Sequence, residues 1–202
     1  MASSINASTS GGGGIITTAD ATGNLDIQSG GSTVVAVTST GVAVTGTLAA
    51  TGASTFTGAV TTPLSYVRVN TANGYGSTNT KIRRFTNIVN NVGTDITYAD
   101  SATLGGTFTI NTTGVYSVSY GDQFTTASGL GVSINSTELT TAIQDITLAN
   151  ILTMTNTPAA GNSTVSSSTF FASAGAVVRA HTNGGTTGAN TMMCQFTIAR
   201  VQ

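Results

Sequence analysis

The chain has 202 residues, with 6 Lys+Arg, 7 Asp+Glu and a formal net charge of −1. So few cations cannot neutralise a phosphate backbone, so we expect no nucleic-acid binding. No apolar run reaches the roughly 18 residues that a membrane-spanning helix needs, so we expect no membrane insertion. Charged residues are only 6% of the chain, and we expect a surface so poor in charge to be covered largely by other copies of the chain.

The first segment, residues 1–14, is rich in Ser and Asn and ends in four glycines. Such a segment has little apolar surface to bury and is typically flexible when alone. We therefore expect it to act as an anchoring segment that a partner holds in place. The candidate docking residues lie within it and just after it, and they are Ile5, Asn6, Ile15 and Ile16.

Residues 15–63 form a repeat of very short predicted strands separated by Thr-Gly and Ser-Gly turns. Alternation at Leu25/Ile27 and at Val42/Val44 has the period of two that is typical of strands. Each piece is too short to bury a core of its own, so several chains have to share one. The pattern predicts an intertwined, trimeric β-stem, with a flexible Gly/Thr linker as the alternative. The candidate residues on its three-fold axis are Val42, Val44, Leu48, Phe56 and Val60.

Residues 64–202 are predicted to form one globular β domain. Short apolar runs recur every 8–12 residues with Asn-Gly, Gly-Gly and Pro turns between them, which is typical of a sandwich or jelly roll. The run at 143–152 has some helical spacing, but its Thr content favours a strand. The predicted strands are 64–69, 81–86, 106–111, 114–124, 130–135, 146–154, 164–173, 176–182 and 192–201.

The residues that usually carry catalysis are few. His181, the single histidine, is expected to be a solvated residue at a strand end, and Cys194, the single cysteine, a small buried side chain. No nucleophile elbow, phosphate-binding loop or metal-ligand spacing is present. We therefore expect no catalytic residue, no metal site and no cofactor. The enzymatic alternative is a glycan-cleaving spike, which would need two of the seven scattered acids to meet as a glycosidase pair.

Half of the basic residues lie together in Lys81, Arg83 and Arg84. They are candidates for holding a surface anion or for pairing with acids on a neighbouring subunit. The alternative is a solvated edge strand, on which basic residues protect against pairing with other sheets.

The Thr-Gly repeat of residues 15–62 resembles the stems of fibre and decoration proteins of tailed bacteriophages. The string "ATGNLDIQSGGSTVVAVTSTGVAVTGTLAATGASTFTGAV" carries this resemblance. It implies an elongated particle protein rather than an enzyme.

Residues 82–202 are similar to the trimeric jelly roll of tumour necrosis factor and the complement-type globular heads. The resemblance lies in "FTINTTGVYSVSYGDQF", "LGVSIN", "FFASAGAVVRAHTN" and "CQFTIARV". Ala176 stands where the family usually has an acid. The resemblance implies a homotrimer in which inward-facing aromatic side chains pack around the three-fold axis. The candidates for that role are Tyr116, Tyr120, Phe124 and Phe196.

Together these patterns predict an all-β protein with a β-stem followed by a jelly-roll knob, in three parts: residues 1–14, 15–63 and 64–202. The expected function is a non-enzymatic, homotrimeric capsid decoration or cement protein on the surface of a phage virion, docked on the major capsid protein. The alternative is a short tail fibre, docked on tail components, whose knob binds host glycans.

Overall fold

The computed structural model describes residues 24–49, 51–55, 57, 64–70, 74–157, 159–188 and 190–201. The chain divides into two compact units, Met1–Val60 and Thr61–Gln202, and each is described by itself. The predicted docking and stem residues Ile5, Asn6, Ile15, Ile16, Phe56 and Val60 lie outside the described residues.

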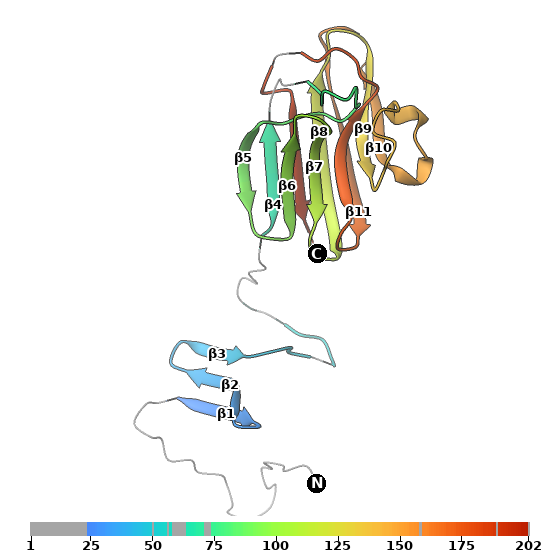
Figure 1. The fold of residues 1–202 in the computed structure, drawn as a ribbon. Coiled ribbons are helices and arrows are strands. Elements are labelled where there is room, and N and C mark those ends of the chain that lie inside the picture. The colour runs from blue at the N-terminus through green and yellow to red at the C-terminus, as the bar shows by residue number, and fades with distance from the viewer. Residues whose placement is uncertain are drawn as a thin grey trace, which may run out of the picture. The chain divides into compact units, whose positions relative to one another are not determined.

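The first unit holds a three-stranded antiparallel meander of β1 (Leu25–Ser29), β2 (Ser32–Thr38) and β3 (Gly41–Val44) (Figure 1). The turn between β1 and β2 is made by Gly30 and Gly31 at φ 61° and 81°, a left-handed conformation that favours glycine. The ladders close within one chain. The predicted wrapping of this unit around other copies stays a prediction. Contacts between side chains, rather than backbone pairing, would have to hold the copies together.

The second unit is a sandwich of two five-stranded antiparallel sheets (Figure 1). The β8 sheet has the order β11-β8-β13-β4-β5, and the β9 sheet has the order β10-β9-β12-β7-β6. The strands of the β8 sheet are β4 (Tyr66–Asn70), β5 (Asn87–Val92), β8 (Gly114–Gln123), β11 (Ser163–Ala172) and β13 (Gln195–Arg200). Those of the β9 sheet are β6 (Ile96–Ser101), β7 (Gly105–Ile110), β9 (Ser128–Ile134), β10 (Ile151–Thr157) and β12 (Val177–Thr182).

The core lies between these two sheets, because alternate side chains of each strand point inward. The rings of Phe108 and Phe196 stack across it with centroids 4.3 Å apart. Tyr116, Tyr120, Phe124 and Phe196 are all 0% exposed within the single chain. Their predicted place at a three-fold axis is therefore wrong, because a side chain enclosed by its own sandwich has no surface to offer another copy.

Two strand predictions need correction, and two strands were missed. Residues 81–86 form no strand, because they lie in the connection between β4 and β5 and make only isolated bridges, one of them between Ile82 and His181 of β12. The strand predicted at 146–154 starts only at Ile151 as β10, because Leu148–Asn150 form the short 3-10 turn η2. A second 3-10 turn, η1 (Ile143–Asp145), precedes it, so the strand favoured for 143–152 is wrong before Ile151. Strands β5 and β6 were not predicted, since their Asn-rich and polar sequences lack a clear alternation.

The turn η1 lies against the outer face of the β9 sheet. Ile143 is fully buried there, beside the glycines of β9. A Cβ atom at Gly131 would lie 2.3 Å from the Thr153 carbonyl oxygen and 3.1 Å from Ile143 Cγ1. Glycine is thus required where the chain covers its own sheet. No helix of the described residues is long and apolar enough to cross a membrane.

Candidate assembly surfaces

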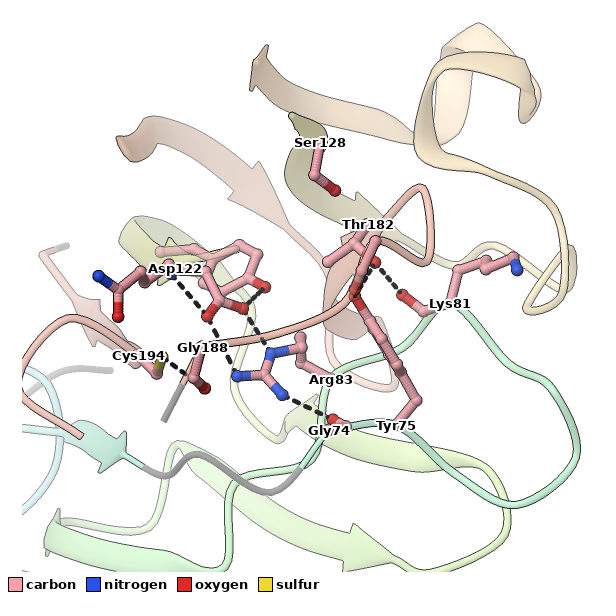
Figure 2. Close-up of polar contacts among 12 residues, drawn as sticks. Gly74, Tyr75, Lys81, Arg83, Asp122, Ser128, Thr182, Gly188 and Cys194 are labelled. Carbon is pink, nitrogen blue, oxygen red and sulfur yellow. Dashed lines mark hydrogen bonds and ion pairs between the residues drawn. The ribbon is translucent and has the colours of Figure 1, made fainter. Parts of the chain in front are cut away.

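Two of the three residues in the predicted basic cluster form ion pairs with acids of the same chain. Arg83 and Asp122 are both fully buried, and Arg83 donates to Asp122 from Nε and from Nη2, the latter at 3.1 Å (Figure 2). Arg83 Nη1 donates to the Gly74 carbonyl at 2.8 Å, and the Tyr120 hydroxyl donates to Asp122 at 2.6 Å. The predicted anion or inter-subunit role is wrong for Arg83, which ties the segment before β5 to strand β8.

The surroundings of this ion pair are closed by further buried groups (Figure 2). The Tyr75 hydroxyl donates to the Gly185 carbonyl at 2.8 Å and accepts from Thr182 Oγ1 at 2.9 Å. Burial raises the pKa of Tyr75 to about 12 and that of the Cys194 thiol to about 11, so both stay protonated at neutral pH. The expectation of a buried Cys194 is confirmed. The cluster stabilises the sandwich and leaves no open site.

The other two basic residues differ from each other. Arg84 forms a two-point ion pair with Asp100 of β6 in the same chain, with Nη2 2.6 Å from Oδ2, and both side chains stay about one-fifth exposed, so its anion or inter-subunit role stays a prediction. Lys81 is partly buried and takes part in none of the ion pairs among the described residues. For Lys81 the anion or inter-subunit role stays a prediction.

His181 is fully buried, so the expectation of a solvated histidine is wrong. Its Nε2 donates to the Thr141 carbonyl at 2.8 Å, which leaves Nδ1 to accept from the Ser133 hydroxyl at 3.1 Å. Burial lowers the pKa of His181, and the Thr141 carbonyl opposes that shift only in part. The neutral ring therefore fastens the loop that carries η1 to the β9 sheet. Among the described residues no three His, Cys, Asp or Glu side chains gather as a metal site.

The outer face of the β8 sheet has a different character from the covered β9 face. Register places small side chains in rows across it, such as Ser167, Ser119 and Thr197, or Thr169, Ser117 and Ala199. Larger apolar side chains flank these rows, and Val165 and Phe171 are 62% and 66% exposed. We call this the β8 face, and its residues are Tyr66, Arg68, Asn70, Val115, Ser117, Ser119, Gly121, Val165, Ser167, Thr169, Phe171, Gln195, Thr197 and Ala199.

A second apolar face lies in the first unit. Register aligns Leu25, Val37 and Val42 in one row, and Ile27, Val35 and Val44 in the next. Directly paired residues share a face, so these six side chains form one patch, which we call the stem face. Val42, Val44 and Leu48 are 65%, 38% and 73% exposed. The role that was predicted for them at a three-fold axis stays a prediction.

Four members of the stem face were not named from the sequence: Leu25, Ile27, Val35 and Val37. Their alternation is visible in the sequence, but which of them share a face with Val42 and Val44 depends on register. That register includes an irregularity after Ile27. A reading that paired β1 and β2 outward from the Gly30-Gly31 turn without this bulge would have paired Ile27 with the wrong partner.

Comparisons with known proteins identify the fold. No protein-family model matches the chain. No curated protein matches it either. Among solved structures it is similar to the crystal structure of murine APRIL at pH 8.0, with a TM-score of 0.52, 14% identity, and coverage of 68% of this chain and 99% of that chain. The structure of murine APRIL at pH 8.5 gives a TM-score of 0.52 and 13% identity over the same shares. The second unit is thus a tumour-necrosis-factor-like jelly roll, and at this identity the likeness shows the fold alone.

Proposed function

We propose that this chain is a non-enzymatic, homotrimeric structural protein of a bacteriophage virion. It is a capsid decoration or cement protein that attaches through its N-terminal segment to the major capsid protein and presents the jelly roll outward. The observation that carries the proposal is the pair of exposed sheet faces that are almost free of charge, one in each unit, which suit association of identical copies.

The β8 face supports assembly through its side chains. Arg68 is the one charged residue among its described members, so two copies of the face meet with little repulsion. Rows of Ser, Thr, Ala and Gly let another backbone approach closely. Burying the exposed apolar side chains at its margins stabilises association by roughly 25 cal/mol per Å².

The stem face supports assembly in the same way. The meander leaves Leu25 and Ile27 50% and 48% exposed within one chain, so covering them with other copies would stabilise it through apolar burial. Three copies that turn their stem faces inward would bury Leu25, Ile27 and Val42 together. The two units therefore support the same oligomer independently.

The virion placement is supported by the Thr-Gly repeat of the first unit and its resemblance to phage stems. The non-enzymatic character is supported by the polar groups of the kinds that most often carry catalysis, because they hydrogen-bond within the protomer. His181, Arg83 and Asp122 are each buried and bonded within the protomer.

Two measurements test the proposal. Light scattering of the purified chain is expected to give three times the mass of the 20.1 kDa protomer. A label at the C terminus, imaged on intact phage particles, is expected to decorate the head at regular intervals. Label confined to the tail would replace decoration with the tail-fibre alternative, in which the jelly roll binds host glycans. Absence of the protein from purified particles would overturn both placements.

A further inference from the structure

The β8 face holds a groove of about 520 Å³ at one end. Its lining includes the Arg68 side chain, the hydroxyls of Ser119 and Thr197, and the apolar side chains of Val165 and Met193. The groove thus combines one cation with hydroxyl donors on a face that is otherwise uncharged.

Arg68 has unused hydrogen-bonding capacity in this groove. Its Nη2 donates to Gln195 Oε1 at 2.9 Å, which occupies one of the five N–H donors of a guanidinium. The ion pairs of the described residues join Arg83 to Asp122, Arg84 to Asp100 and Arg200 to Asp95, and none includes Arg68. The positive charge is compensated by solvent as long as the face is open.

Covering the face removes that solvent. A guanidinium taken out of water without an anionic partner costs several kcal/mol, and the β8 face supplies no carboxylate of its own. Carboxylate and phosphate oxygens are the partners that match the planar fork of an arginine, which can hold them at two points.

We infer that Arg68 binds an oxyanion, a carboxylate or phosphate group, when the β8 face is covered by a neighbouring copy. The inference rests on the proposed homotrimer and adds a ligand site to its interface. Ser119 and Thr197 donate further hydrogen bonds to the same oxygens. The oxyanion comes either from solution or from an Asp or Glu of the neighbouring copy, and the chemistry at Arg68 is the same in both cases.

The test compares the full-length chain with Arg68→Gln, and with Arg179→Gln as a matched control that removes the same charge from strand β12 of the other sheet. The concentration at which the trimer dissociates is measured by light scattering on dilution, in chloride and in 10 mM phosphate at equal ionic strength. A free oxyanion predicts at least tenfold tighter assembly in phosphate for the wild type and for Arg179→Gln, and no change for Arg68→Gln.

A carboxylate from the neighbouring copy predicts a different pattern. Phosphate then has no effect, and Arg68→Gln alone weakens assembly at least tenfold. The inference is overturned if phosphate does not change the assembly of the wild-type trimer and the Arg68→Gln trimer is at least as stable as the wild type. The homotrimer itself would stand in that case. A wild type that stays monomeric at every concentration overturns the homotrimer and the interfacial site together.

Discussion

At the scale of single residues, the sandwich depends on both members of the buried pair of Arg83 and Asp122 being present. Both side chains are fully enclosed, and the carboxylate also accepts from Tyr120 and from the Gln123 backbone. Such a network is stable only when it is complete, because each charge depends on the other for compensation.

We predict that Asp122→Asn lowers the free energy of unfolding by about 3–5 kcal/mol, because it leaves the guanidinium of Arg83 buried without a counter-charge. Urea unfolding measures the change. The control is Asp100→Asn, whose pair with Arg84 is about one-fifth exposed at both side chains and should cost at most about 1 kcal/mol. Equal losses in the two variants would contradict a special role for the buried pair.

His181 gives the fold a predictable dependence on pH. Burial lowers its pKa below the ordinary value of about 6.5, with a further small decrease from Arg179 and opposing contributions from the Thr141 carbonyl and Glu138. Below pH 6.5 the unfolded chain takes up a proton that the folded chain excludes, so stability falls as the pH decreases.

The expected result is a free energy of unfolding that is constant above about pH 7 and declines between pH 6.5 and 5. The limiting slope is about 1.4 kcal/mol per pH unit. Denaturant unfolding at half-unit steps measures it. The His181→Gln variant should lose the slope in this window, and parallel curves for the two proteins would show that His181 is not responsible.

At the scale of elements, period-two alternation decides which side chains meet. In the sandwich it places Tyr116 and Tyr120 in the core and leaves Ser117 and Ser119 on the β8 face. In the meander it separates the apolar stem face from a reverse side that carries Asp26, Ala36 and Ala43.

We predict that Ile27→Asp combined with Val37→Asp weakens assembly at least tenfold. Each substitution removes an apolar side chain worth about 1.5–3 kcal/mol on burial and adds like charges that face one another. Sedimentation on dilution measures the change. The matched control, Ala36→Asp with Ala43→Asp, adds the same charges to the reverse side of the same strands. If both pairs behave alike, the stem face does not contact other copies.

At the scale of the whole molecule, the two outer faces of the sandwich differ in whether the chain itself covers them. The outer side of the β9 sheet is covered in part by the turn η1, with Ile143 packed on the glycines of β9. The β8 face has exposed apolar side chains at its margins and small residues at its centre.

We predict that Ser119→Arg, at the centre of the β8 face, prevents trimer formation or weakens it at least tenfold, because a covered interface would enclose an uncompensated charge. Light scattering gives the mass, and circular dichroism checks that the fold is kept. Ala99→Arg, on the exposed edge strand β6 of the other sheet, is the control and should leave assembly unchanged. A trimeric Ser119→Arg variant would place the interface elsewhere.

The sequence by itself determined the fold class and most of the strands. Alternation and turn residues are local signals, so they located β7, β8, β9, β11, β12 and β13 to within a few residues. The string "FTINTTGVYSVSYGDQF" also indicated a jelly roll, through its resemblance to the tumour necrosis factor family. The low content of charged residues led to the expectation of assembly. This signal can be taken from the sequence because it depends on composition alone.

Only the tertiary structure decided which apolar or charged residues face inward. Tyr120 and Phe196 look the same in the sequence whether a sheet or a neighbouring copy covers them, and the sandwich encloses them. Arg83 and Asp122 are 39 positions apart, and no local pattern indicates that they pair. The β8 face and the stem face likewise exist only through register between strands, because a surface is made by residues that are neighbours in space and distant along the chain.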